Sequence, residues 1–362
     1  MSRKVLLLGP KRTAVSGVST HLNQLLNSPL ADAYRLVHFQ VGSEGEREGP
    51  FDKLQRFLLS PFRLAARIIA VAPDIVHLNT SLDQKAFWRD AVYMLVAKLF
   101  GKRVVYQIHG GDLPQQFFGG RPLLTGFLRQ LLRWPDAVVL LASLEREAYG
   151  RFSRFRTLRV IPNAIELDDH PPNYRKEFRS ETIRLGYIGR LAYNKGIVEA
   201  IDALGILRKS GYGQVTLTLA GSGPAEESLR ARVKLLGLEG YVTFSGELFG
   251  QQKKSFWRHT DIFVFPTYQE GLPYAVLESL DSGTPMVTTQ AGGIRDVITD
   301  GVEGIFVEPR DAAGVAAAIQ TLMSDRGRME SMSAACVARA REWYGIDRLA
   351  RQFSELYGSV LG

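Results

Sequence analysis

The sequence predicts an α/β fold built as two domains, each with a parallel β-sheet covered by helices. The chain has 362 residues, which is longer than one hydrophobic core usually supports, and 45% of them are hydrophobic, an ordinary share for a soluble protein. In both halves, short β-branched runs alternate with segments of helical period, which is typical of parallel strands joined by crossover helices.

The first series of predicted strands lies in residues 1–168, at 4–8, 34–39, 75–78, 103–108 and 137–141. A polar, proline-bearing stretch from Asp168 to Asn173 then marks the hinge between two domains. The second domain is placed at residues 169–345, with predicted strands at 183–187, 216–220, 242–245, 262–265, 286–289 and 304–307. The last stretch, 346–362, has helical spacing, and we expect it to pack back onto the first domain.

Several classes of protein are excluded by composition. The single cysteine, Cys336, rules out an internal disulfide framework and cannot supply a zinc site alone. The longest apolar stretches, such as Ala91 to Phe100, are too short or too interrupted to span a bilayer, which needs about 20 apolar residues. The N-terminus fits a first β-strand better than a signal peptide. We therefore expect a cytoplasmic protein.

The basic charge is unevenly distributed. The net charge is +8, and the whole excess lies in residues 1–170, which favours an anionic partner such as nucleic acid, acidic lipid or a phosphorylated substrate. Two segments, Phe51 to Ala70 and Phe127 to Trp134, mix apolar with basic residues, as helices on anionic membranes do. Ordinary core-facing helices with solvated basic residues explain them equally well, and Pro61 is a candidate break in the first.

The strongest local motif is residues 266–278, which follow an apolar strand and open a helix. Pro273 suits the first helical position, and Leu272 before it offers no side-chain oxygen to cap the following amides. An uncapped helix start at the carboxyl end of a parallel strand is where α/β proteins bind phosphate. Glu270 and Glu278 flank it, and carboxylates suit sugar and ribose hydroxyls. The alternative is a poorly capped surface helix with solvated glutamates.

A second motif supplies positive charge. The strand ending at Gly189 is followed by a turn with Arg190 and Lys195, so both cations lie at the mouth of the second domain. Two cations on one loop can clamp a diphosphate and stabilise the charge that grows on it when a sugar departs. Each alone is more simply a solvated surface charge, but their coincidence with the helix start favours the clamp.

Together these motifs resemble the family-4 glycosyltransferases, or glycosyl transferases group 1, which are retaining enzymes of the GT-B fold. The resemblance covers essentially the whole chain. The family's basic loop is similar to Gly189 to Gly196, and its Glu-x7-Glu signature to Glu270 to Glu278. It implies two Rossmann-like domains facing across a cleft, transfer with retention, a nucleotide-sugar donor (UDP- or GDP-sugar most often), and no obligatory metal or other cofactor.

The resemblance also implies roles for individual residues. By it, His109, Arg190, Lys195 and Glu270 are the catalytic set: His109 faces the reacting sugar, Arg190 and Lys195 bind the diphosphate, and Glu270 positions the sugar. Glu278 holds the ribose, and the segment with Leu248 lies against the base. Backbone groups of Gly17, Gly271, Leu272 and Tyr274 complete the donor site. The chain departs from the family at Leu272-Pro273, where many members have Phe-Gly, so one backbone donor is missing.

The sequence therefore predicts a glycosyltransferase with an acceptor-side first domain and a donor-binding second domain. The acceptor would be a lipid-linked or other glycan in polysaccharide or glycoconjugate assembly, with peripheral contact to anionic membrane at its inner face. Two alternatives stay open. A nucleotide-sugar epimerase of the same fold would need no second substrate. A non-catalytic nucleic-acid- or anion-binding protein would explain the charge but not the Arg190, Lys195, Glu270 and Glu278 set, so no nucleic-acid partner is expected.

Overall fold

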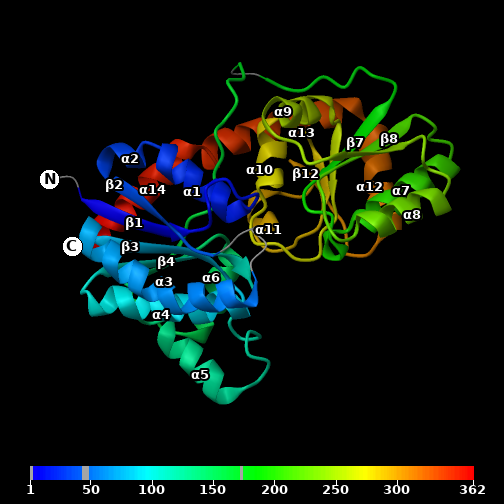
Figure 1. The fold of residues 1–362 in the computed structure, drawn as a ribbon. Coiled ribbons are helices and arrows are strands. Elements are labelled where there is room, and N and C mark those ends of the chain that lie inside the picture. The colour runs from blue at the N-terminus through cyan, green and yellow to red at the C-terminus, as the bar shows by residue number, and fades with distance from the viewer. Residues whose placement is uncertain (1–2, 43–48, 172–173) are drawn as a thin grey trace. The chain divides into compact units, whose positions relative to one another are not determined.

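The computed structural model describes residues 3–42, 49–171 and 174–362, and the chain divides into two compact units (Figure 1). Unit 1 comprises Met1–Glu166 and Gly345–Gly362, and unit 2 comprises Leu167–Tyr344. Each unit contains one six-stranded parallel sheet with helices on its faces. The predicted α/β class with two Rossmann-like domains is confirmed.

Unit 1 has the strand order β2-β1-β3-β4-β5-β6. Its strands are β1 (Lys4–Gly9), β2 (Arg35–Gln40), β3 (Ile75–Leu82), β4 (Arg103–Gly111), β5 (Ala137–Leu140) and β6 (Leu158–Val160). Its helices are α1 (Gly17–Asn27), α2 (Leu30–Ala33), α3 (Pro50–Val71), α4 (Gln84–Leu99), α5 (Pro122–Leu131), α6 (Ser143–Phe152) and α14 (Ile346–Leu361). The order reverses between β1 and β3, which is one place where such sheets bind ligands.

The two faces of the unit 1 sheet are buried by different helices, because successive strand residues point to opposite sides. Val5 and Leu7 of β1 pack with α1, α2 and α14. Leu6 and Leu8 pack on the other face with α3 to α6. Figure 1 shows the C-terminal helix α14 beside α1 and α2, and Phe353 and Tyr357 of α14 are fully buried in this core. The last helix of the chain thus completes the first unit.

Unit 2 has the strand order β12-β11-β10-β7-β8-β9. Its strands are β7 (Ile183–Ile188), β8 (Val215–Ala220), β9 (Val242–Gly246), β10 (Ile262–Phe265), β11 (Met286–Thr288) and β12 (Gly304–Phe306). Its helices are the 3₁₀ turn η1 (Tyr193–Lys195), α7 (Ile197–Lys209), α8 (Glu226–Leu235), α9 (Gly250–His259), α10 (Tyr274–Asp281), α11 (Ile294–Val297), α12 (Ala312–Met323) and α13 (Arg326–Trp343). Here the order reverses between β7 and β10.

Some local predictions are corrected. The short edge strand β6 was not predicted, and β3 and β4 continue to Leu82 and Gly111. The break considered at Pro61 is wrong, because α3 continues through it. Part of that segment lies outside the described residues, namely the side chains of Phe51, Asp52, Lys53, Leu54, Arg56 and Phe57. Residues 172 and 173 of the predicted hinge lie outside them as well. None of the described helices combines the length and apolar character needed to cross a bilayer.

Candidate functional site

The loops after β7 and β10 carry the predicted basic and acidic residues of unit 2. Arg190 and Lys195 follow β7, Glu270 follows β10, and these two strands are paired neighbours. The strand order of the sheet reverses between them, so both loops leave the carboxyl end of the sheet at this reversal. The sequence motifs therefore meet at the position where doubly wound sheets bind ligands.

Glycine allows these loops to approach closely. Gly196 has φ +68, and a Cβ on it would lie 2.0 Å from the carbonyl oxygen of Pro266. Gly292, in the loop after β11, has φ +54, and a Cβ there would lie 1.9 Å from the carbonyl oxygen of Glu270. Both positions need the left-handed backbone and the missing side chain of glycine. Close packing of three loops thereby fixes the backbone around Lys195 and Glu270.

Lys195 and Glu270 form a direct ion pair. The Lys195 ammonium donates to Glu270 Oε1 at 2.6 Å, and the Thr267 hydroxyl donates to the same oxygen at 3.2 Å. The two side chains are 19% and 12% exposed, so the pair is partly dehydrated but still in contact with solvent. Charge-assisted hydrogen bonds of this kind hold both groups in defined positions. In this structure the Glu270 carboxylate balances the charge of Lys195, and a bound anion would have to replace that carboxylate.

Arg190 lies at the turn after β7, where the Tyr187 hydroxyl donates to its carbonyl oxygen at 3.0 Å. Its side chain is exposed, and within the described part of the chain its guanidinium has no ion-pair partner. The structure thus brings Lys195 and Glu270 together, whereas Arg190 contributes an unneutralised cation on the same loop. Its guanidinium is available to a ligand in solvent.

The helix after Glu270 begins one residue later than predicted. Tyr274 is the first residue of α10, and Pro273 is its N-cap in an extended conformation. Among the described residues, no side chain caps this helix. Leu272 is buried, and Gly271 is held by the amide of Gly293, which donates to its carbonyl oxygen. Pro273 is therefore a cap that offers no side-chain oxygen, and the positive end of the α10 dipole faces the Glu270 loop.

Glu278, on α10, is held by two residues of α9 that the sequence did not single out. Lys253 donates to Glu278 Oε1 at 2.6 Å, and the indole nitrogen of Trp257 donates to Oε2 at 3.2 Å. Each carboxylate oxygen keeps further acceptor capacity for a ligand hydroxyl. Burial, with the Glu278 charge, raises the pKa of Tyr274 well above its usual value, so this phenol stays protonated. Leu248 lies half-buried in the loop before α9.

In unit 1, His109 lies near the end of β4 beside two other histidines. Its Nε2 is 3.2 Å from Asn79 Oδ1, and the Asn79 amide donates to Leu8. That orientation of Asn79 makes Nε2 the protonated nitrogen and leaves Nδ1, for which the described residues provide no partner, as an acceptor. The rings of His21 and His109 are 4.7 Å apart.

Burial keeps the three histidines neutral. It lowers the pKa of His21 and of His77 to about 3, and it lowers the pKa of His109 well below its usual value. His77 is fixed by Tyr357 of α14, whose hydroxyl lies 2.6 Å from its Nδ1. A neutral His109 can accept a hydrogen bond from a hydroxyl but carries no charge near pH 7.

Gly17 is the first residue of α1, directly after the N-cap Ser16. Ser16 Oγ accepts from the Ser19 amide at 3.2 Å, and its φ of −151 is ordinary extended backbone. Serine therefore fits this position without strain, and it caps the helix whose first turn carries Gly17.

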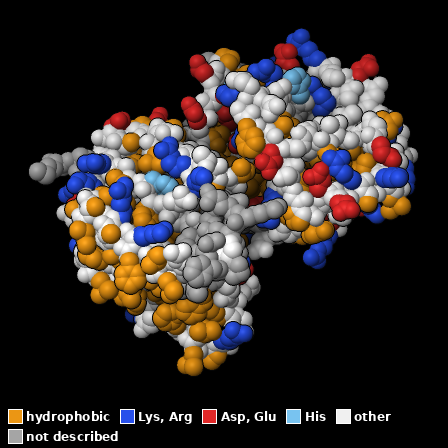
Figure 2. All heavy atoms as spheres, in the orientation of Figure 1, with side chains coloured by type: hydrophobic (Ala, Val, Ile, Leu, Met, Phe, Trp, Pro, Cys, Tyr) orange, Lys and Arg blue, Asp and Glu red, His pale blue; other side chains and the backbone are white. Residues whose placement is uncertain are grey.

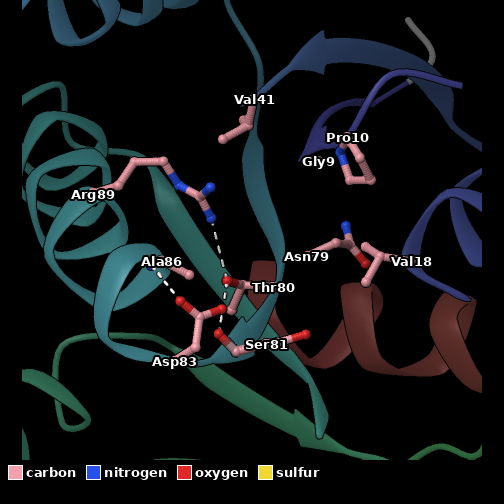
Figure 3. Close-up of a pocket in the computed structure, with 10 residues that line it drawn as sticks. All are labelled: Gly9, Pro10, Val18, Val41, Asn79, Thr80, Ser81, Asp83, Ala86 and Arg89. Carbon is pink, nitrogen blue, oxygen red and sulfur yellow. Dashed lines mark hydrogen bonds between the residues drawn. The ribbon is translucent and has the colours of Figure 1, made fainter. Parts of the chain in front are cut away.

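A pocket in unit 1 lies where its strand order reverses (Figure 3). It encloses about 400 Å³ including its open mouth. The guanidinium of Arg89, from α4, donates to the Thr80 hydroxyl at 3.3 Å and also pairs with Asp90 at 2.8 Å. The bond to Thr80 is the dashed line from Arg89 in Figure 3. Asn79, the partner of His109, lines the same pocket. The lining residues are Gly9, Pro10, Val18, Val41, Asn79, Thr80, Ser81, Asp83, Ala86 and Arg89. Hydroxyl, amide and charged groups of this kind suit a polyhydroxylated ligand.

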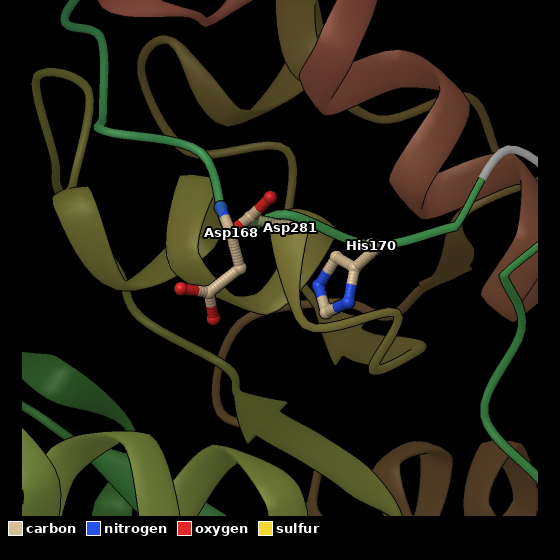
Figure 4. A group of neighbouring side chains, drawn as sticks. All are labelled: Asp168, His170 and Asp281. Atoms are coloured by element: carbon tan, nitrogen blue, oxygen red, sulfur yellow. The ribbon is translucent and has the colours of Figure 1, made fainter.

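One cluster in unit 2 has the side chains of a metal site (Figure 4). Asp168 and His170 open the unit and Asp281 ends α10, and their ligand atoms lie within 4.8 Å of one another. Lys254 already pairs with Asp168 at 2.6 Å. Burial raises the pKa of Asp281 to about 6. Because a cation would compete with the Lys254 ammonium, these contacts favour an ion-pair network that anchors the start of unit 2.

Two family models match the chain: Glycosyltransferase Family 4 over residues 16–169, and Glycosyl transferases group 1 over residues 173–343. Glycogen synthase of Mycobacterium tuberculosis is 30% identical over 198 residues, covering 55% of this chain and 47% of the relative. The GDP-mannose-dependent alpha-(1-6)-phosphatidylinositol monomannoside mannosyltransferase of the same species is 27% identical over 263 residues, covering 68% and 66%. The chain thus spans about half of the first relative.

Among solved structures, sucrose-phosphate synthase from Thermosynechococcus elongatus has a TM-score of 0.80 with 17% identity, covering 99% of each chain. This likeness shows that the fold is shared along the whole chain.

Proposed function

Because the chain belongs to the family-4 glycosyltransferases and has the GT-B fold, we propose that it transfers a sugar from a nucleotide-diphosphate donor to an acceptor, with retention of anomeric configuration. The observation that carries this proposal is the Lys195–Glu270 ion pair at the reversal point of the unit 2 sheet, beside the exposed Arg190 and the start of α10. These groups lie on loops fixed by glycine contacts, as a preorganised site requires.

Donor binding exchanges partners within this site. The diphosphate takes the ammonium of Lys195 away from Glu270 and binds the guanidinium of Arg190, while the α10 dipole adds a favourable field. The Glu270 carboxylate is released in the same step, and it then accepts hydrogen bonds from sugar hydroxyls. Before binding, the two residues neutralise each other; afterwards the diphosphate neutralises Lys195, and the sugar hydroxyls donate hydrogen bonds to Glu270.

The chemical step is driven by charge stabilisation. The bond between the anomeric carbon and the diphosphate breaks as the acceptor hydroxyl forms the new glycosidic bond on the same face and passes its proton to an oxygen of the leaving diphosphate. Negative charge grows on the leaving diphosphate, where Arg190 and Lys195 lower its energy. His109 accepts a hydrogen bond from the sugar through Nδ1, and Gly17 lends an amide. Glu278 takes the ribose hydroxyls and Leu248 lies against the base. Turnover is expected to persist in EDTA.

The acceptor is proposed to bind unit 1, at the pocket lined by Thr80, Asp83 and Arg89. The excess basic charge of the first half of the chain favours a lipid-linked or phosphorylated glycan. The name of the mannosyltransferase relative gives that protein a phosphatidylinositol-linked acceptor, in line with this choice. Neighbouring Asn79 links the pocket to His109, so the acceptor would lie close to the predicted sugar contact.

The test combines donor binding and product analysis. A thermal-shift panel of UDP-, GDP-, ADP- and dTDP-sugars identifies the donor, and mass spectrometry then detects acceptor carrying one added sugar. Conversion of the donor without any acceptor would instead indicate an epimerase. Salt-sensitive DNA binding without donor affinity would indicate a nucleic-acid-binding protein.

The exchange of partners gives a sharper test. Glu270→Gln removes the competitor for Lys195, so nucleoside diphosphate should bind as well as before or a few-fold more tightly while turnover falls about 10²-fold or more. Arg190→Ala should weaken nucleoside diphosphate binding and turnover together. Equal loss of nucleotide affinity in both variants would contradict the exchange.

A further inference from the structure

Unit 1 exposes a group of apolar side chains on the outer side of α3, α4 and α5. Figure 2 shows hydrophobic side chains gathered over this part of the unit. We name this surface the apolar face; its exposed members are Leu58, Leu59, Phe62, Ile69, Trp88, Leu95, Leu99, Leu123 and Phe127. Single exposed apolar residues are ordinary, but a continuous group of this size on one side of a unit marks a contact surface.

The α4 part of this face is a helical stripe. Trp88, Leu95 and Leu99 follow each other at intervals of seven and four residues, which places them on one line along the helix. The core side of α4 is buried through Phe87, Met94 and Ala97. The helix is therefore apolar on both its core side and its outer side. Packing within unit 1 requires only the core side to be apolar.

The neighbouring helices extend the stripe. On α3, Leu64 and Ile68 face the core, whereas Phe62 is 74% exposed and Ile69 lies seven residues further along the same outer line. Helices α3 and α4 pack against each other, and Trp88 of α4 stacks on Phe127 of α5 with ring centroids 5.8 Å apart. The three helices thus present one connected apolar face.

The described surface charges of these helices are positive. Among the described side chains of α3, α4 and α5, the only carboxylate is Asp90, which is buried against Arg89. The described basic residues of these helices are Arg63, Arg67, Lys85, Arg89, Lys98 and Arg129. Arg89 is paired with Asp90 and Lys98 with Asp136, so the described charges of these helices that have no ion-pair partner among the described residues include Arg63, Arg67 and Lys85. Positive charge beside an apolar face fits a partner that is apolar inside and anionic outside.

We propose that the apolar face docks unit 1 onto an anionic phospholipid bilayer, with Phe62, Trp88 and Leu99 entering the acyl boundary and the arginines contacting lipid phosphates. The choice of partner rests on the proposed function, in which the acceptor is lipid-linked. A second copy of the chain fits less well, because an isologous contact would place two positively charged surfaces together, and the described part of these helices offers no surface carboxylate to offset them.

The test uses a matched pair of leucines. Leu99 is the last residue of α4 and is 77% exposed, and Leu235 is the last residue of α8 in unit 2 and is 75% exposed. Co-sedimentation with phosphatidylcholine vesicles, with and without an anionic phospholipid, is measured for the wild type, Leu99→Glu and Leu235→Glu. Thermal unfolding and the nucleoside diphosphate thermal shift of each protein are measured alongside.

We expect the wild type and Leu235→Glu to bind the anionic vesicles equally, and Leu99→Glu to bind them at least tenfold less. The unfolding temperature and the thermal shift with nucleoside diphosphate should be the same for Leu99→Glu as for the wild type. Equal binding by all three proteins, or no vesicle binding by the wild type, would overturn the proposal. Concentration-dependent dimers that Leu99→Glu abolishes, without vesicle binding, would assign the face to a second copy. If the vesicles bind as expected but no nucleoside diphosphate binds, the result would support the apolar face as a membrane-docking surface and would contradict the proposed glycosyltransferase function.

Discussion

Replacing Lys195 by alanine removes one partner of the ion pair at the centre of the candidate site. At about 4 Å between charge centres and an effective dielectric constant of about 20, the Coulomb attraction is about 4 kcal/mol. The Lys195 and Glu270 side chains are only 19% and 12% exposed, so desolvation offsets much of this attraction. We expect Lys195→Ala to lower the free energy of unfolding by about 1–3 kcal/mol, because Glu270 keeps only the Thr267 hydroxyl.

The effect on turnover should be larger than the effect on stability. Loss of a cation that neutralises the leaving diphosphate is expected to reduce kcat by about 10²–10³-fold. Urea unfolding gives the stability change, and single-turnover kinetics under conditions where the variant stays folded gives the rate. Lys254→Ala is the matched control, because Lys254 pairs with Asp168 at the same 2.6 Å but the two side chains are 55% and 41% exposed. That control should lose at most about 1 kcal/mol and keep its turnover. A Lys195→Ala rate within about threefold of the wild type would refute the diphosphate role.

Three further substitutions test the structure around the site. Gly196→Ala should destabilise unit 2 by more than about 2 kcal/mol in chemical unfolding, because the new Cβ would meet the Pro266 carbonyl. Gly237→Ala is the control: Gly237 has a similar φ of +65 but nothing within 4 Å of its Cβ position, so this change should cost only about 1 kcal/mol. Equal costs for the two variants would contradict the close contact at Gly196. Burial raises the pKa of Asp281 from 3.8 to about 6, so folding favours its protonated form and stability is lost as pH rises through this window. Asp281→Asn should therefore stabilise the protein by about 1–2 kcal/mol at pH 7 and by nothing at pH 4 in thermal unfolding, and a stabilisation independent of pH would be inconsistent with this cause. Tyr357→Phe leaves buried His77 without its 2.6 Å partner and should cost about 1–3 kcal/mol in urea unfolding; no change would show that the bond does not anchor α14.

Much of the fold follows from local sequence pattern. Apolar runs such as Ile262 to Phe265 are buried on both sides in the sheet, and this gives the continuous hydrophobicity that predicted them. The spacing predicts the C-terminal helix at 346–362, and α14 runs from Ile346 to Leu361. The edge strand β6 was missed because its three residues, Leu158 to Val160, are too few for a period to be recognised.

The candidate site was predictable where one loop carries the chemistry, and not where distant elements meet. Arg190 and Glu270 stand in motifs that can be read along the chain, whereas Lys253 and Trp257 reach Glu278 from a different helix. No spacing in the sequence signals that contact. Asn79 could have been noticed as a polar residue near a strand end, but its hydrogen bond to His109 depends on the pairing of β3 with β4.

The prediction of a membrane-facing surface was also limited by contacts that the sequence does not show. Basic and apolar residues mix in the segment Phe51 to Ala70, and this mixture favours a membrane-surface helix. The α4 stripe with Trp88 and Leu99 instead has the composition of an ordinary buried helix. Only the packing of the sheet decides which side of such a helix is left exposed.

Isothermal titration calorimetry with UDP, GDP and ADP, on the wild type and on the Arg190→Ala, Lys195→Ala double variant, tests the central claim most directly. The wild type should bind at least one of these diphosphates at one per chain, and the folded double variant should bind it at least 100-fold more weakly, because both cations proposed to hold the diphosphate are gone. Equal affinities in the two proteins, or no binding to the wild type, would contradict the account.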